Sequence, residues 1–268
     1  MKRKLASSKA APVAAFLLRV QAVGRHNART LKHSASWLLR SREYTNFTYD
    51  LTPLNRDHLA WFVSTVADIE IGEARGYLDE IEEDNALRAH VWAATTDSTH
   101  HNLADRAARF GRRIGWYALA RAVKPEHIVE TGTDKGLGSV VLAAALLRNG
   151  CGRLTTIDVN PDAGYLLTGR YATVADLRIG DSLAVLKKLE AVDLFLHDSD
   201  HSSTHEAAEL AAVTPHLTGR ALALSDNAHV TDELPKWAER QGRRFLFFDE
   251  RPAGHWYPGG GIGVSLPR

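Results

Sequence analysis

Cysteine is almost missing from this chain of 268 residues, and long apolar runs are missing altogether. The single cysteine, Cys151, excludes an intrachain disulfide and favours a reducing compartment, the cytoplasm. No apolar stretch approaches the roughly 20 residues that span a bilayer, and the longest near the start, residues 10–18, is followed at once by Arg19. The length and the ordinary composition predict a soluble chain with room for one large α/β domain and an appendage.

Acidic residues are absent from positions 1–42, which hold ten Lys or Arg. The rest of the chain is acidic, with 32 Asp or Glu against 23 Lys or Arg. An acidic body argues against nucleic acid as a partner, because phosphate binding needs basic surface. Three interpretations of the basic arm stay open. It is a solubilising extension, which ranks first, or a helix that associates weakly with an anionic membrane surface, or a contact with a second subunit of a homodimer.

Two regions follow the arm. Residues 43–125 have helical patterns and are expected to form a lid region, with Tyr44, Asn46, Tyr49 and Trp116 as candidate contacts. From residue 126 to 268 short apolar strands alternate with helices, one of which is expected from about Pro161. The expected strands are 127–130, 153–158, 176–179, 192–197, 221–224, 245–248 and 262–266. This order predicts a doubly wound, mostly parallel seven-stranded α/β sheet, which binds ligands beyond the carboxyl ends of its strands.

A glycine-rich turn, residues 131–138, follows the first expected strand and opens a helix. Its glycines let the backbone approach a ligand without a Cβ in the way. Short-chain dehydrogenases have the same glycine spacing, so an NAD(P) oxidoreductase is an alternative. Those enzymes also need a tyrosine with a lysine four residues later, and none of the seven tyrosines has one. The dehydrogenase therefore ranks lower.

Polar residues at the next two strand ends support a cofactor cleft. Asp158 ends the second expected strand, 26 residues after Gly132, where a carboxylate can accept hydrogen bonds from both ribose hydroxyls. Asp181 and Ser182 follow the third strand, where an adenine edge would lie. Taken singly, Asp158 and Asp181 have a simpler interpretation as helix caps.

The segment Glu130-Thr131-Gly132-Thr133 with Gly136, followed by residues 155–162, resembles the first two motifs of cation-dependent O-methyltransferases. These belong to the class I S-adenosylmethionine-dependent methyltransferases and include catechol, caffeoyl-coenzyme A and bacterial sugar O-methyltransferases. The resemblance covers roughly residues 127–230. It implies a Rossmann-like methyltransferase fold in 126–268 and S-adenosylmethionine as cofactor, with Glu130 near its methionine end and Asp158, where the family often has Glu, on its ribose. The predicted cofactor-binding residues are Glu130, Gly132, Thr133, Gly136, Asp158, Asp181, Ser182 and Asp198.

The fourth and fifth expected strands end in residues 197–201 and 225–229, which are rich in Asp, Asn and His. The resemblance implies that Asp198, Asp226 and Asn227 hold a divalent cation, and their oxygen atoms are ligands that Mg²⁺ prefers. In the alternative interpretation these residues only cap a helix and orient the cofactor. A soft-metal site ranks lower; it would use the histidines of this region, His197, His201, His205 and His229.

Methyl transfer to a hydroxyl needs a base, because an alcohol is a poor nucleophile until its proton leaves. His201 lies three residues beyond Asp198, where the related enzymes place a lysine or a histidine, and is the predicted base; His229 is the second candidate. The expected acceptor is a hydroxyl of a sugar, a glycoside or another small molecule. The loop around Trp256 closes over this acceptor or, in the alternative interpretation, Trp256 packs against the edge of the sheet. A metal-independent methyltransferase that relies on His201, and a non-catalytic cofactor-binding scaffold, remain alternatives.

Overall fold

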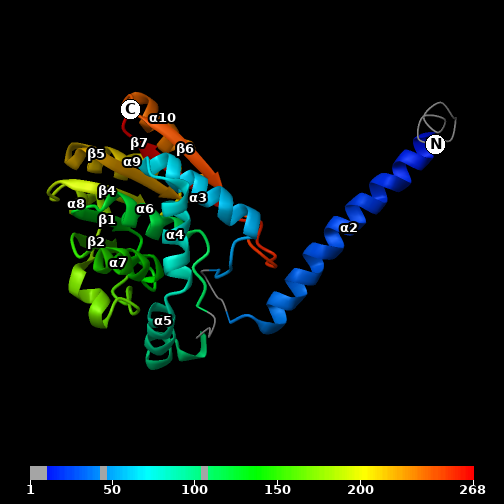
Figure 1. Ribbon diagram of the computed structural model, residues 1–268, viewed down its shortest axis with the longest axis horizontal. Coiled ribbons are helices and arrows are strands. Elements are labelled where there is room, and N and C mark those ends of the chain that lie inside the picture. Colours follow the sequence, from blue (N-terminus) through cyan, green and yellow to red (C-terminus); the bar gives the residue numbers. More distant parts are fainter. Residues whose placement is uncertain (1–10, 43–46, 104–107) are drawn as a thin grey trace. The chain divides into compact units, whose positions relative to one another are not determined.

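The computed structural model describes residues 11–42, 47–103 and 108–268, and they form two compact units (Figure 1). Residues 11–41 with 254–258 make up one unit, whose main element is the helix α2 (Ala11–Arg40). Residues from 42 to 253 and from 259 to 268 make up the other. None of the helices in these described ranges combines the length and the apolar character needed to cross a membrane.

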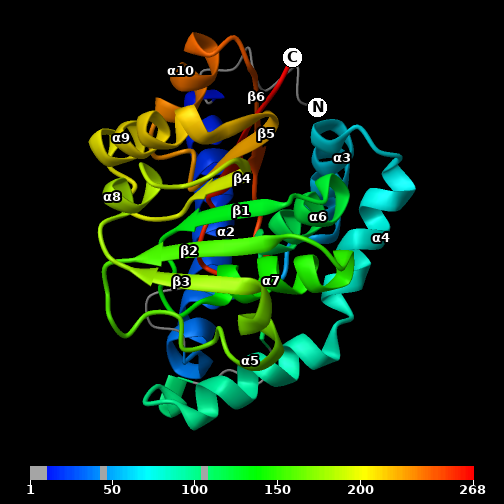
Figure 2. The ribbon, with the colours of Figure 1, turned by 90° about the vertical axis from the view of Figure 1, so that its left-hand side faces the viewer.

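The larger unit is built on one seven-stranded sheet with the strand order β3-β2-β1-β4-β5-β7-β6 (Figure 2). All neighbouring strands are parallel except β7, which runs antiparallel to both β5 and β6. The predicted mostly parallel seven-stranded sheet is therefore confirmed. The strands are β1 (His127–Thr131), β2 (Arg153–Asp158), β3 (Ala175–Ile179), β4 (Val192–His197), β5 (Leu217–Asp226), β6 (Arg244–Asp249) and β7 (Gly261–Leu266).

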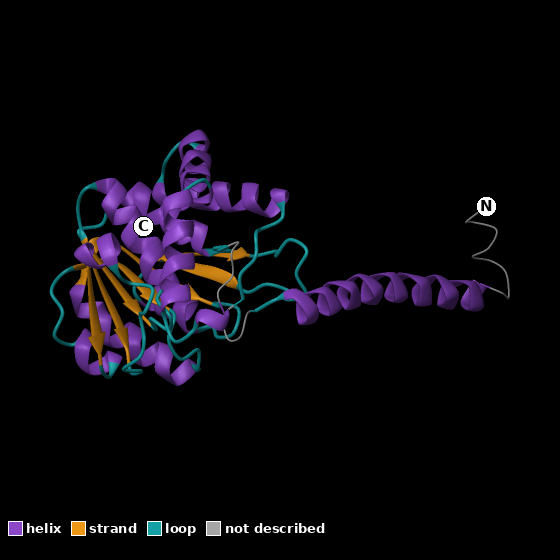
Figure 3. Ribbon diagram, turned by 90° about the horizontal axis from the view of Figure 1, so that it is seen from below, coloured by secondary structure: helices purple, strands orange, loops and turns teal. Residues whose placement is uncertain are grey.

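Helices cover both faces of the sheet, as Figures 2 and 3 show. On one face α7 packs on β2 and on α6, and α6 contacts α3 and α4; on the other, α8 contacts β2, α9 contacts β4, and α10 contacts β6 and β7. The helices are α3 (Pro53–Ala67), α4 (Ile71–Glu82), α5 (Asn85–Asp97), α6 (Arg113–Val123), α7 (Leu137–Asn149), α8 (Ser182–Leu186), α9 (Ser203–Val213) and α10 (Glu233–Arg240). Short 3₁₀ turns are η1 (His101–Leu103), η2 (Gly169–Val174) and η3 (Thr214–His216).

Alternation along β1 sends successive side chains to opposite faces of the sheet. Val129 belongs to the apolar core with Leu210 of α9, and Thr131 hydrogen-bonds Glu209 of the same helix. Glu130, between them, points to the other face and bonds Ser139 of α7. A buried parallel strand of five residues therefore presents a carboxylate to one helical layer and a hydroxyl to the other.

The region 43–125 does not form a separate lid. Its helices share one compact unit with the sheet, so the predicted boundary at 125/126 separates no units. Trp116 of α6 is fully buried and Tyr49 is 2% exposed, because both complete the core beside the strands. Their predicted contribution to a lid stays a prediction, and Tyr44 and Asn46, the other two candidates, lie outside the described residues.

The helix expected from Pro161 is also absent. Residues 161–166 form turns, followed by η2. Gly164 has a φ of 77°, a left-handed conformation that ends an α-helix, and its amide donates to Asp134 O at 2.7 Å. The segment thus folds back on the glycine-rich turn and does not continue along the sheet.

Candidate functional site

The glycine-rich turn lies against the end of β4. Gly132 has a φ of 88°, and a Cβ built there would lie 2.0 Å from the carbonyl oxygen of Asp198. Any side chain at this position would push the turn away from β4. Gly136 has a φ of 92° and begins α7. These two glycines bring the turn and the start of α7 to the carboxyl edge of the sheet, where sheets of this kind bind ligands.

Glu130 lies beneath that turn and is 1% exposed. Thr156 donates to its Oε2 at 2.7 Å, and Ser139 donates to the same oxygen. Burial raises the pKa of Glu130 to about 7, although both hydroxyls favour the carboxylate. Gly138 allows this packing, because a Cβ there would lie 2.5 Å from Glu130 Oε1. Thr133, 3% exposed, hydrogen-bonds Thr156 at 2.6 Å and extends the same network.

Asp158 ends β2 and joins two turns. Its Oδ2 accepts from the Asp134 amide at 2.8 Å, and its Oδ1 accepts from the Asn160 amide at 2.8 Å. Each carboxylate oxygen keeps a further lone pair for a ligand hydroxyl. After β3, exposed Asp181 caps α8 by accepting from Leu183 N at 3.2 Å, while Ser182 is buried. The helix-cap interpretation of Asp181 therefore describes what this side chain does.

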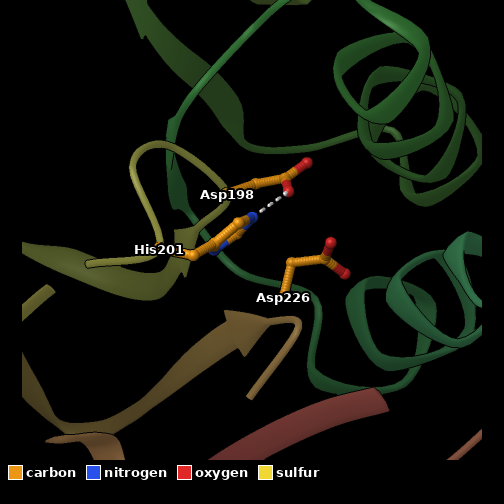
Figure 4. Close-up of side chains that lie close together, drawn as sticks. All are labelled: Asp198, His201 and Asp226. Carbon is orange, nitrogen blue, oxygen red and sulfur yellow. Dashed lines mark ion pairs between the residues drawn. The ribbon is translucent and has the colours of Figure 1, made fainter. Parts of the chain in front are cut away.

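Three side chains converge at the ends of β4 and β5 (Figure 4). His197 of β4 is in register with Ser225 of β5, so the next residues, Asp198 and Asp226, are neighbours. One ligand atom from each of Asp198, His201 and Asp226 lies within 4.8 Å of the others, and His201 Nε2 is 3.9 Å from Asp198 Oδ1. The sequence predicted that these residues meet, and the structure brings them together.

The two aspartates differ in charge. Burial and the adjacent Asp226 raise the pKa of Asp198 well above its usual range. Burial also opposes ionisation of Asp226, but the guanidinium of Arg112 outweighs it and lowers the pKa of Asp226 to about 2. Close carboxylates cannot both ionise without compensation. The negative charge of the pair is therefore favoured on Asp226, beside Arg112.

Arg112 supplies the compensating charge from the residue before α6. Its guanidinium forms a bidentate ion pair with Asp226, in which Nε donates to Oδ1 and Nη2 donates to Oδ2. Its Nη1 donates to Glu250 Oε1 at 2.9 Å and to Tyr49 Oη at 3.1 Å. Tyr49 Oη and the Gly260 amide also donate to Glu250, at 2.8 and 2.6 Å. This buried cluster, which we call the Arg112 cluster, ties segments far apart in the chain to the end of β5.

Asn227, the third predicted metal ligand, is turned partly toward this cluster. Its Oδ1 accepts from Arg112 Nη2 at 3.3 Å, and its Nδ2 lies 3.1 Å from His201 Nε2. A φ of 51° places it in the turn after β5. His229, two residues later, is exposed and lies outside the convergent group of Asp198, His201 and Asp226. His201 is therefore the better placed of the two candidate bases.

A second polar network supports His201 from below. His197 is fully buried, and its Nδ1 lies 2.7 Å from Glu209 Oε2. The His197 and His201 rings meet edge to face, with centroids 5.5 Å apart. Burial opposes the charge of Glu209, but His197, Ser182 and Thr131 together lower its pKa to about 2. Burial lowers the pKa of His201 below its ordinary value, although the charge of Asp226 raises it, so its ring is neutral near pH 7.

In this network the histidines are arranged differently from the predicted soft-metal cluster. His197 and His205 both bond Glu209, the latter at 2.9 Å, so neither faces Asp226. A soft-metal site of four histidines is not formed. Sequence reasoning missed Arg112, Glu250 and Glu209, and it assigned Tyr49 to a lid and not to the Arg112 cluster. The available signal was a pair of arginines, 112 and 113, at the head of an otherwise apolar helix, since arginines there need buried partners.

Residues 129–228 match a family model described as a methyltransferase domain. That span contains the predicted cofactor residues and the carboxylate pair, and the match favours a methyltransferase over the dehydrogenase alternative. No curated protein sequence matches the chain.

Solved structures share the fold. The O-methyltransferase TomG from Streptomyces achromogenes, involved in tomaymycin synthesis and solved with SAM, is 21% identical with a TM-score of 0.51, over 69% of this chain and 90% of that one. A methyltransferase from Geobacter sulfurreducens is 21% identical with a TM-score of 0.51, over 72% of this chain and 93% of that one. The SAH-bound methyltransferase of Podospora anserina is 15% identical with a TM-score of 0.51, over 72% and 93%. These likenesses establish a Rossmann-like methyltransferase fold.

Proposed function

Because residues 129–228 form a methyltransferase domain, we propose that the chain transfers the methyl group of S-adenosylmethionine to a hydroxyl oxygen. The observation that carries this proposal is the placement of two kinds of group on one edge of the sheet. The glycine-rich turn with Glu130 and Asp158 lies at the ends of β1 and β2, and Asp198, Asp226 and His201 lie at the ends of β4 and β5. A cofactor and an acceptor bound at these ends would meet at Asp198.

The cofactor half is proposed to work through backbone and carboxylates. Gly132 and Gly136 allow the close approach of the turn, while Glu130 faces the methionine end and Asp158 the ribose hydroxyls. Thr133, Asp181, Ser182 and Asp198 complete the proposed contacts. Solved proteins of the same fold carry SAM or SAH, which supports this choice of cofactor.

A divalent cation such as Mg²⁺ is the proposed partner of the acceptor half. The donor set fits it, since Asp198 and Asp226 supply carboxylate oxygens within 4.8 Å of His201 Nε2 and Arg112 neutralises only one of the two carboxyl groups. Asp198, Asp226 and Asn227 would hold the cation. When bound, it stabilises negative charge on an acceptor oxygen. His201, neutral near pH 7, is the proposed base for the acceptor's proton, and its ring packs edge to face on the buried His197.

The same contacts support a second mechanism, without a metal. Arg112 occupies both oxygens of Asp226 and also bonds Asn227, so two of the three proposed ligands already serve a fixed cation. In this mechanism His201 removes the proton, and the buried guanidinium stabilises negative charge near Asp226. The two mechanisms make opposite predictions for chelator treatment.

The proposed acceptor is a sugar, a glycoside or another small molecule with vicinal hydroxyls, which two adjacent metal coordination sites would suit. The acidic body disfavours nucleic acid as acceptor or partner. We further propose a homodimer and a cytoplasmic location; the latter rests on Cys151, a free and exposed thiol that suits a reducing compartment.

Calorimetric titration of chelator-treated protein with S-adenosylmethionine, then with Mg²⁺ in its presence, tests the proposal. Asp158→Asn should weaken cofactor binding, whereas the exposed control Asp176→Asn on β3 should not. Asp226→Asn should abolish Mg²⁺ binding and leave cofactor binding near the wild-type value. Cofactor binding without Mg²⁺ binding favours the mechanism based on Arg112. Failure to bind S-adenosylmethionine would overturn the proposed function and favour a scaffold role.

The role of His201 is tested separately. Formation of S-adenosylhomocysteine is measured with sugars and diols as acceptors. His201→Ala should lower kcat by about 10²-fold to 10⁴-fold, the usual contribution of a general base, with cofactor affinity unchanged. His229→Ala is the matched control and should keep wild-type turnover. Equal activity of both variants would rule out His201 as the base.

A further inference from the structure

The helix α2 divides into two faces of opposite chemistry. At 100° per residue, one side gathers the apolar residues Val13, Phe16, Leu17, Val20, Val23, Leu31 and Leu38. All seven side chains are more than half exposed, and no residue of the helix is buried. Of its other exposed large apolar residues, only Leu18 and Leu39 lie off this side. A helix of about 45 Å therefore carries large apolar side chains along one side, interrupted by Gly24, Asn27 and Ser34, and none of its residues is buried.

The rest of the helix surface carries the basic residues, with Leu18 and several alanines among them. It carries Arg19, Arg25, Arg29, Lys32 and Arg40, and the helix contains no Asp or Glu. Two hydroxyl side chains on or beside the apolar side form hydrogen bonds to backbone carbonyl groups of the same helix. Thr30 donates to His26 O at 3.2 Å, and Ser34 donates to Thr30 O at 2.8 Å. The partner of α2 must therefore accept an apolar surface and supply negative charge beside it.

Two other partners, a nucleic acid and a second copy of α2, fit less well. A nucleic acid would match the basic face but leave the apolar face exposed. A second copy of α2 would need a regular seam, and the positions at alternating spacings of four and three from Val13 include Gly24, Asn27 and Ser34. Two such helices would also set basic flanks side by side without an acid to pair them. An anionic lipid surface satisfies both faces at once.

The last turn of α2 adds an aromatic cluster. The Trp37 ring lies 5.4 Å from the Trp256 ring and 6.2 Å from the His255 ring, centroid to centroid. His255 and Trp256 belong to the loop between β6 and β7, which shares a unit with α2. Aromatic side chains of this type concentrate at membrane–water interfaces. The cluster lies within the smaller unit, which holds α2 and residues 254–258.

We propose that α2 is a membrane-surface helix, which lies in the headgroup region of an anionic leaflet with its apolar face inward. The proposal does not depend on the methyltransferase function. It gives the basic arm a specific task, the binding of an anionic lipid surface.

Vesicle co-sedimentation of the full chain tests the apolar face. Vesicles of phosphatidylcholine alone are compared with vesicles of equal parts phosphatidylcholine and phosphatidylserine. Leu17→Ser with Leu38→Ser should weaken binding to the anionic vesicles by at least about tenfold, since two buried leucines are lost. Leu18→Ser with Leu39→Ser is the matched control, with the same composition but off the apolar face, and should bind as the wild type does.

The basic face has its own variant. Arg25→Glu with Arg29→Glu and Lys32→Glu should weaken binding by at least about 100-fold, because each basic residue near an anionic surface contributes roughly 1 kcal/mol. Lys187→Glu with Lys188→Glu and Arg240→Glu, exposed on the body, should change it little. Circular dichroism confirms that each variant keeps its helix content.

Three results would overturn the proposal. The wild type stays in the supernatant with anionic vesicles; both leucine pairs lose binding equally; or the Leu17/Leu38 variant keeps vesicle binding while its mass in solution falls to that of a smaller oligomer, which would assign the face to a second copy.

Discussion

The two halves of the site are assembled in different ways. The cofactor half, defined by Glu130, Gly132 and Asp158, comes from one stretch of fewer than 30 residues with β1, α7 and β2. The acceptor half, defined by Asp198, His201 and Asp226, depends on Arg112 from before α6 and on Glu250 from after β6. One half is held by local backbone geometry, and the other by buried charges that meet only in the folded chain.

This difference predicts different kinds of sensitivity. The cofactor half should fail when backbone contact is blocked, because its glycines have no conformational substitute. The acceptor half should fail when a charge is removed, because the partners left behind remain buried and unpaired. Four substitutions test these statements.

Gly132→Ala should have the largest effect. A Cβ at this position would lie 2.0 Å from Asp198 O, and the residue has a φ of 88°. We expect a loss of about 4 kcal/mol or more in the free energy of unfolding, together with loss of S-adenosylmethionine binding. Urea denaturation and calorimetry measure the two effects.

Gly150→Ala is its matched control. Gly150 also has a positive φ, 70°, but a Cβ there would meet nothing within 4 Å. The control should cost only about 1–2 kcal/mol, the penalty of the left-handed backbone alone. If both alanine variants lose the same stability, the close approach of Gly132 to β4 contributes nothing.

Arg112→Met should have the next largest effect. It keeps much of the volume of the side chain but leaves Asp226 and Glu250 buried without a counter-charge. Removing one partner of a buried ion pair costs about 3–5 kcal/mol, which urea denaturation at neutral pH would detect. Arg75→Met, which breaks the exposed pair with Asp57, should cost no more than about 1 kcal/mol. Similar losses in the two variants would contradict a structural role for the Arg112 cluster.

The same contrast explains what the sequence could predict. The seven mostly parallel strands, the glycine-rich turn and the strand-end residues Asp158, Asp198 and Asp226 follow from local patterns, and the structure places the turn and these three residues at the carboxyl edge. The burial of Trp116 could not be predicted, because an amphipathic helix has the same pattern whether it covers a core or a cleft. Arg112 was missed for a related reason: its acidic partners, Asp226 and Glu250, lie more than 100 residues away in the chain.

Glu209 lies beneath both halves, and its removal should change acid stability. The folded protein holds the pKa of Glu209 at about 2, below its ordinary 4.5. A lowered pKa stabilises the fold above pH 4.5, and this stabilisation, about 3 kcal/mol, is lost as the pH falls from 4.5 to 2. Glu209→Gln should therefore be less stable at neutral pH and should lose less on acidification. Exposed Glu239→Gln is the control and should follow the wild-type curve in urea titrations at each pH; a Glu209→Gln curve parallel to it would contradict the assignment.

Glu130 should show the opposite sign and the smallest effect. Burial raises the pKa of Glu130 from 4.5 to about 7 in the folded chain. The free energy of unfolding therefore falls as the pH rises from 4.5 to 7, and this destabilisation is absent only below pH 4.5. Glu130→Gln removes the slope, but the amide gains weaker bonds from Ser139 and Thr156 than a carboxylate does. We expect a gain of about 1 kcal/mol above pH 7, no gain at pH 4, and weaker binding of S-adenosylmethionine. Loss of stability above pH 7 would mean that the hydroxyls outweigh burial, and that the cofactor half, like the acceptor half, depends on a buried negative charge.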